Sequence, residues 1–169
     1  MRTGADEVRN PKYAHIERER RWLVDPKRRP DLSNVPYLLI EDRYISGTRM
    51  RMRRMTDSET GEQSLKLTKK YECADPLARP IVTIYLTDEE YTLLAMMPAA
   101  GLAKRRYKVD GFSIDRFEGA LSGLELAEIE WTDDEGLRDL QPPIWAVAEV
   151  SDEPRFQGGA LAADGKPKD

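Results

Sequence analysis

Charged residues occupy every second position in several short segments of the sequence. The first such segment places Glu17, Glu19 and Arg21 in this spacing. Later segments repeat the spacing mostly with one sign of charge, at Arg49, Arg51 and Arg53, at Lys66 and Lys70, at Lys104, Arg106 and Lys108, and at Glu128 and Glu130. Carboxylates are ligands that Mg²⁺ and Mn²⁺ accept, and Arg and Lys bind phosphate oxygens. These residue types predict a site for a phosphate chain held with divalent metal ions.

A spacing of two indicates β-strands, because successive side chains of a strand point to opposite faces. Arg49 and Arg51 then share one face, and Met50 and Met52 share the other. Eight segments show such alternation between turn-prone clusters: 15–24, 37–46, 48–55, 63–71, 80–86, 103–109, 112–118 and 124–131. Eight strands suffice to close a barrel. We therefore predict a mainly β, α+β fold, an eight-stranded antiparallel closed β-barrel or tunnel with a few flanking helices.

Local signals place the connections between these strands. Asp110-Gly111 is typical of a two-residue hairpin turn, which requires positive φ angles. Thr87 and Glu90 form a capping-box pattern that predicts the start of a helix. A shorter helix is expected over 133–140, because the prolines that follow lack the amide that a helix needs.

The charged faces have two interpretations. They could form the solvated face of an ordinary antiparallel sheet, which is the common origin of such alternation. However, like charges in a row on one strand repel each other, and here the acidic and basic rows lie on different strands. A closed barrel would bring them together across a shared lumen, so we favour the lumen as the site. Thr68 and Ser113 are expected to be hydrogen-bonding wall residues rather than nucleophiles, because no motif places a base beside them.

Composition excludes several other classes of site and protein. His15 is the only histidine, which argues against a His-rich zinc site and a Ser-His-Asp triad. Cys73 is the only cysteine, which suits a reducing compartment, and we expect a cytoplasmic protein. The formal net charge of -4 opposes nucleic-acid binding. Trp22 and Trp131 are expected to be core aromatics rather than base-stacking platforms, because they lie on the faces opposite the charged rows.

The chain of 169 residues fits one domain. We expect a flexible N-terminal arm at 1–12, a tunnel domain at 13–162 and a disordered tail at 163–169. The longest uncharged run, 92–103, is too short to span a membrane and contains Pro98. Neither a signal peptide nor a membrane segment is therefore predicted.

The motif Glu17-x-Glu19-x-Arg21 resembles the Glu-x-Glu-x-Lys hallmark of the CYTH superfamily, also called triphosphate tunnel metalloenzymes. The resemblance continues in order over residues 16–161, through the segments 49–51, 68–70, 104–107, 114–115, 128–131 and 149–151. It implies an eight-stranded tunnel, dependence on Mg²⁺ or Mn²⁺, and hydrolysis of tripolyphosphate, thiamine triphosphate or nucleoside triphosphates by attack of water on the terminal phosphorus. Some members instead convert ATP to cyclic AMP.

The resemblance also assigns roles to residues. The implied metal ligands are Glu17, Glu19 and Glu130, assisted by Glu128 or Asp115. The implied phosphate-binding residues are Arg49, Arg51, Arg53, Lys70, Lys104 and Arg106, with Lys66 in reserve. The implied catalytic residues are Glu17, Glu19, Arg21 and Glu128. The expected partner is a small-molecule triphosphate or polyphosphate, with no nucleic acid or membrane, and a homodimer is possible.

Three departures from the family pattern bear on catalysis. Arg21 replaces a lysine, and a guanidinium that stays protonated cannot act as a base. Ile81 and Thr83 stand where many members carry glutamates, and Ser113 stands where an acidic partner of Asp115 is common. A second metal site is therefore expected to be weak or missing. A triphosphatase is favoured, and an adenylate cyclase of class IV type and a tunnel that binds without turnover remain the alternatives.

Overall fold

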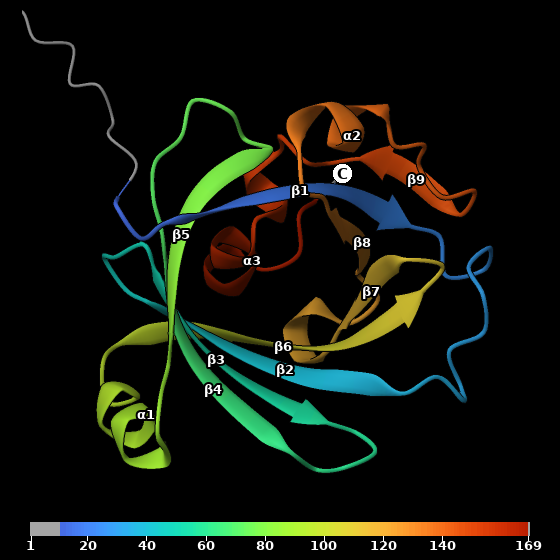
Figure 1. The fold of residues 1–169 in the computed structure, drawn as a ribbon. Coiled ribbons are helices and arrows are strands. Elements are labelled where there is room, and N and C mark those ends of the chain that lie inside the picture. The colour runs from blue at the N-terminus through green and yellow to red at the C-terminus, as the bar shows by residue number, and fades with distance from the viewer. Residues whose placement is uncertain (1–10, 169) are drawn as a thin grey trace, which may run out of the picture.

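The computed structural model describes residues 11–168 and shows a closed antiparallel β-barrel (Figure 1). Its eight strands are β1 (His15–Val24), β2 (Tyr37–Ile45), β3 (Met50–Asp57), β4 (Gln63–Lys70), β5 (Ala78–Tyr85), β6 (Ala99–Val109), β7 (Phe112–Phe117) and β8 (Glu125–Glu130). The strand order is β5-β4-β3-β2-β6-β7-β8-β1, and β1 closes the ring by pairing with β5. The predicted fold class is confirmed.

Strand β1 is paired along both of its edges, and one of these edges is divided between two partner strands. On one side it pairs with β8, with Glu19 opposite Glu130. On the other side its first residues pair with β5, with Glu17 opposite Arg79, and its last residues pair with the short additional strand β9 (Ala146–Glu149). The N-terminal strand is therefore held by segments from the middle and from the end of the chain.

The turns and helices follow the local signals. Asp110 and Gly111 have φ angles of 50° and 82°, as the two-residue hairpin requires. Thr87 caps α1 (Asp88–Leu94), because its hydroxyl accepts from the Glu90 amide at 3.2 Å and the Glu90 carboxylate accepts from the Thr87 amide at 2.9 Å. The second predicted helix is α2 (Asp134–Asp139), capped by Asp133. No helix within residues 11–168 is long and apolar enough to cross a membrane.

The outer face of β1, β7 and β8 carries the largest apolar cluster. Trp22, Ile114 and Ile129 pack there with Leu137 of α2. This packing fixes the opposite, charged face of the same strands toward the lumen, because side chains alternate. Trp131 is 43% exposed, so the expectation that it is a core aromatic is wrong. It lies just beyond the end of β8, where alternation no longer sets its direction.

The third helix, α3 (Gly158–Asp164), lies within the ring of strands (Figure 1). Its Leu161 and the preceding Phe156 pack against Phe117 and Leu126 from the inner faces of β7 and β8. This apolar cluster fills one part of the barrel interior. The helix runs two residues past the boundary predicted at 162, and residues 1–10 of the predicted arm lie outside the described part of the chain.

Candidate functional site

A cavity of about 360 Å³ lies inside the barrel, and half of its lining residues are charged. Among residues 11–168, four carboxylates and eight cationic side chains line it: Glu17, Glu19, Glu128 and Glu130, and Arg21, Arg49, Arg51, Arg53, Lys70, Arg79, Lys104 and Arg106. Eleven of them come from six strands, β1, β3, β4, β5, β6 and β8, and Arg49 lies just before β3. The acidic and basic rows of the sequence therefore meet in one cavity, where the excess of cationic side chains favours a bound anion.

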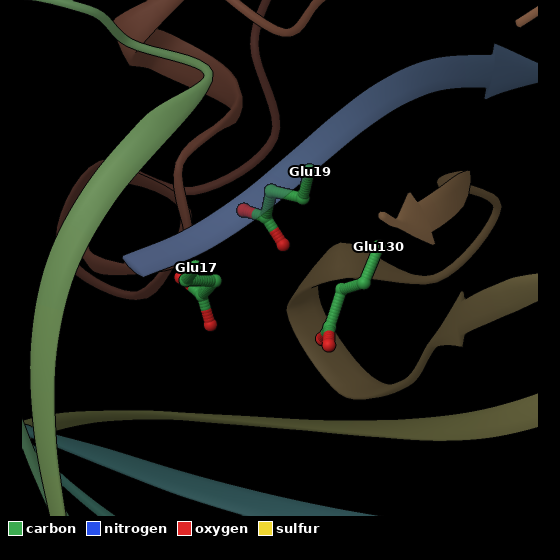
Figure 2. A group of neighbouring side chains, drawn as sticks. All are labelled: Glu17, Glu19 and Glu130. Atoms are coloured by element: carbon green, nitrogen blue, oxygen red, sulfur yellow. The ribbon is translucent and has the colours of Figure 1, made fainter. Parts of the chain in front are cut away.

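Three carboxylates form a cluster at one side of this cavity. Glu17 and Glu19 project from β1 and Glu130 from the end of β8, toward a shared space (Figure 2). One oxygen from each lies within 4.8 Å of the others, and Glu130 is exposed. Carboxylates this close raise one another's pKa unless a cation or a proton joins them. A set of oxygen donors fits Mg²⁺ or Mn²⁺. The three residues were predicted as metal ligands, and the structure brings them together.

Each carboxylate on β1 has a cationic neighbour. Lys70 Nζ donates to Glu17 Oε2 at 2.6 Å, and Arg21 Nη2 donates to Glu19 Oε1 at 3.0 Å. Burial opposes ionisation of Glu17, but Lys70 outweighs it and lowers the pKa of this carboxyl. At Glu19 burial prevails over Arg21, and with the nearby charge of Glu128 it raises the pKa. Glu19 is thus a buried acid that a further cation would stabilise in its ionised form.

Glu128 and Asp115 are surrounded by cations instead. Glu128 pairs with Arg21 at 2.9 Å and with Arg106, and these cations outweigh burial and hold the pKa of Glu128 well below its ordinary value. Asp115 is fully buried behind the cavity wall, where Arg106 binds both of its oxygens and Lys104 binds one. The structure therefore places both predicted assisting ligands outside the Glu17–Glu19–Glu130 cluster.

Asp42 has similar surroundings on β2, which is separated from β7 by β6 alone. Arg53 binds both oxygens of Asp42, at 2.6 and 2.7 Å, and Arg51 Nε lies 3.9 Å from Oδ1. The Arg51 Nε–H is buried and has no hydrogen-bond partner among the described residues. Arg51 lines the cavity and is less closely paired with Asp42 than Arg53 is, so its guanidinium is the freer of the two to contact a ligand there.

Two ionisable lining residues escaped the prediction. Arg79 lies opposite Glu17 in the β1–β5 pairing, and it shares the inner face of β5 with Ile81 and Thr83. The strand predicted at 80–86 begins one residue after Arg79, and the register that brings Arg79 to Glu17 could not be read from the sequence. Tyr44 lines the cavity from β2, and burial together with Asp42 raises the pKa of its phenol to about 12.

Lys66 was predicted to bind phosphate, but it does not line the cavity. It pairs with Tyr85 at the opposite end of β5 from Arg79, and its Nζ lies 5.0 Å from the centroid of the Tyr85 ring. Arg49 does line the cavity, at a position where its side chain is half exposed and paired with Glu72.

The positions where family members carry further acids hold uncharged groups with other contacts. Thr83 Oγ1 lies 2.8 Å from Thr68 Oγ1, and Ser113 Oγ accepts from Lys108 Nζ at 2.6 Å. Within residues 11–168, Glu17, Glu19 and Glu130 form the single cluster of three potential metal ligands. The described residues therefore offer one such cluster rather than two.

The C-terminal part of the chain closes one end of the cavity. The residues that contribute to this end are Pro154, Phe156, Gln157, Gly158, Gly159 and Leu161. The Tyr44 hydroxyl lies so close to Gly158 that a Cβ there would be 1.9 Å from it, so a residue without a side chain is needed at this contact.

Comparisons with solved structures agree with this architecture. The structure of the hypothetical protein NE1496 has a TM-score of 0.56 and 25% identity, over 86% of this chain and 97% of that chain. A structure of NE1496 described as an inorganic triphosphatase has a TM-score of 0.55 and 23% identity, over 86% and 93%. The structure of the PH1819 protein of Pyrococcus horikoshii OT3 has a TM-score of 0.51 and 20% identity, over 73% of this chain and 82% of that chain. No protein-family model and no curated protein matches the sequence. The chain has the triphosphate tunnel (CYTH) fold.

Proposed function

We propose that this protein is a metal-dependent triphosphatase that hydrolyses a linear triphosphate inside the barrel. The observation that carries the proposal is one cavity inside the barrel in which the Glu17–Glu19–Glu130 cluster lies with eight cationic side chains. A triphosphate needs many cationic donors along its length and divalent cations to offset its charge. The expected location is the cytoplasm, where Mg²⁺ and such substrates occur together.

The cationic wall binds and orients the phosphate chain. Arg53 and Arg106 are each held by two bonds to a buried aspartate, so their remaining donors are fixed before the substrate enters. Arg51 supplies a guanidinium that is less completely paired. Such fixed donors stabilise the charge that develops on the leaving phosphate, because they need no reorganisation during the reaction.

Glu17, Glu19 and Glu130 would hold Mg²⁺ or Mn²⁺. When bound, the metal polarises phosphate oxygens and lowers the pKa of water, which supplies a nucleophile near neutral pH. Arg21 does not serve as the base, since Glu128 and Glu19 outweigh its burial and raise the pKa of its guanidinium further. Arg21 keeps its proton and acts on its neighbours by donating hydrogen bonds.

The experiment is a phosphate-release assay on the purified chain with tripolyphosphate, ATP and thiamine triphosphate, each with Mg²⁺, with Mn²⁺ and with EDTA. We expect metal-dependent release of phosphate from at least one triphosphate and none with EDTA. Cyclic AMP formation from ATP without phosphate release would instead support a cyclase. Tight triphosphate binding without any turnover would support a binding tunnel, and either result would overturn the proposal.

A further inference from the structure

The guanidinium of Arg21 joins three separate parts of the site. Its Nη2 lies 3.0 Å from Glu19 Oε1 and 2.9 Å from Glu128 Oε1, and its Nη1 donates to the carbonyl oxygen of Phe156 at 3.0 Å. Glu19 belongs to the carboxylate cluster, and Phe156 lies just before α3. One side chain therefore connects a proposed metal ligand with the segment that closes the cavity.

The backbone of Arg21 holds the same segment. Its amide donates to Ser151 Oγ at 2.8 Å, and its carbonyl accepts from the Val150 amide at 2.8 Å. We call residues 150–161 the closing segment. The closing segment is thus hydrogen-bonded to Arg21 at two places, at residues 150–151 and at Phe156. Farther along, its Leu161 packs in the barrel interior.

The contacts require the two separate nitrogens of a guanidinium. Nη2 points to the carboxylates, and Nη1 points to the Phe156 carbonyl. A lysine presents a single nitrogen, so it could satisfy the carboxylates but not the more distant carbonyl at the same time. The arginine at this position therefore adds a link to the closing segment while it keeps the positive charge beside Glu19.

We propose that Arg21 is a positioning residue that couples the metal-binding carboxylate Glu19 to the closing segment. It orients one oxygen of Glu19, so that the other stays available to the cluster, and the same guanidinium fixes the carbonyl that precedes α3. A hydrogen-bonded neighbour of a metal ligand commonly changes metal affinity by about 10- to 100-fold. Because coupling between two sites is reciprocal, displacement of the closing segment should also weaken metal binding. This inference rests on the proposed metal site.

The first test compares Arg21→Met and Arg21→Lys with the wild type in the absence of substrate. Mn²⁺ affinity is measured by calorimetry, and hydrogen exchange is measured for the amides of 156–164. We expect Arg21→Met to bind Mn²⁺ about 10- to 100-fold more weakly and to exchange faster in α3. Arg21→Lys should recover most of the Mn²⁺ affinity but still exchange faster, because the bond to the Phe156 carbonyl is lost.

The second test perturbs the closing segment without touching Glu19. Gly158→Ala puts a Cβ against the Tyr44 hydroxyl, which displaces the start of α3. We expect faster exchange in α3 together with weaker Mn²⁺ binding. Arg43→Met is the matched control, since Arg43 donates to the carbonyls of Ala95 and Met97 outside the cavity. It should change neither readout.

The results separate this inference from the proposed function. If folded Arg21→Met, checked by circular dichroism, binds Mn²⁺ as the wild type does, the positioning role is overturned even if the wild type hydrolyses triphosphates. If Gly158→Ala loosens α3 but leaves Mn²⁺ affinity unchanged, the coupling is overturned. If the wild type binds Mn²⁺ and the variants behave as expected but no triphosphate is hydrolysed, only the proposed function fails. A wild type that binds no Mn²⁺ overturns both.

Discussion

Two groups of carboxylates lie on the inner side of the barrel, and they differ in how completely cations surround them. The supporting carboxylates, Asp42 and Asp115, are almost fully buried and each faces two cationic side chains. The ligand carboxylates, Glu17, Glu19 and Glu130, lie within 4.8 Å of one another, and Glu17 and Glu19 each have one close cation. The first group is already neutralised by the fold, whereas the second still favours a cation from solution.

This difference separates structural from functional acids. A buried carboxylate is tolerated when its charge and its lone pairs are satisfied, and removal of one partner of such a pair is strongly destabilising. A cluster of like charges instead costs stability until a ligand binds it. The supporting carboxylates should therefore matter most for stability, and the ligand carboxylates should matter most for activity.

The largest expected effect is on activity. Glu19→Gln removes a ligand charge from the cluster, and we expect the metal-dependent hydrolysis of tripolyphosphate to fall by more than about 10³-fold. The fold should persist, because the neutral side chain keeps the shape and removes a buried charge. Phosphate release and circular dichroism measure the two effects, and turnover at the wild-type rate would contradict the metal-ligand assignment.

The largest expected effect on stability comes from the other group. Asp115→Asn leaves Lys104 and Arg106 without their buried counter-charge, so the free energy of unfolding should fall by about 3–5 kcal/mol. Urea denaturation measures the loss, with Glu130→Gln as the control at an exposed ligand carboxylate that should change stability little. Equal losses in both variants would remove the distinction between the two groups.

A smaller effect is expected at the cationic wall. Arg51→Ala removes a charged donor from the cavity, which should weaken tripolyphosphate binding by about 10- to 100-fold, because a charge-assisted hydrogen bond contributes about 1.5–3 kcal/mol. Arg54→Ala is the matched control, since Arg54 lies against the Tyr91 ring of α1 outside the barrel. Calorimetric titration with tripolyphosphate measures the affinity of both variants, and equal affinities would refute a phosphate contact at Arg51.

The smallest expected effect is on the pH dependence of stability. Burial would raise the pKa of Asp42, but Arg53 and Arg51 outweigh it and lower the pKa below its ordinary value of about 3.9. The stabilisation is therefore complete above that value and is lost as the pH falls through the lower, folded-state pKa. Urea unfolding between pH 6 and 3 should show a shallower acid slope for Asp42→Asn than for the wild type; parallel slopes would contradict the pairing.

The barrel and much of its lining were predictable because they follow from local alternation. Arg51 and Arg53 point inward and Met52 points outward by the period of the strand alone, and Asp110-Gly111 fixes one hairpin. The predicted strand at 103–109 is too short, because β6 begins at Ala99, where an apolar run without alternation pairs with the end of β2.

The remaining features depend on contacts between distant segments. Nothing in the alternation distinguishes Asp115, saturated by cations, from Glu130, which is exposed, since both occupy inward positions. Lys66 is inward as well, but it lies too far along β4 to reach the cavity. β9 and α3 are short segments without strong local signals, and they are positioned by contacts to β1 and to the barrel interior.

The division of the β1 edge between β5 and β9 has a consequence for how the protein forms. Glu17 and Glu19 are synthesised more than a hundred residues before Glu130, Val150 and Phe156. Loops of more than a hundred residues must close before β1 meets β8 and β9, and such non-local pairing makes folding slow. The metal cluster therefore does not exist on the growing chain, and a ribosome-bound product that ends before residue 130 has no assembled site with which to take up the ion.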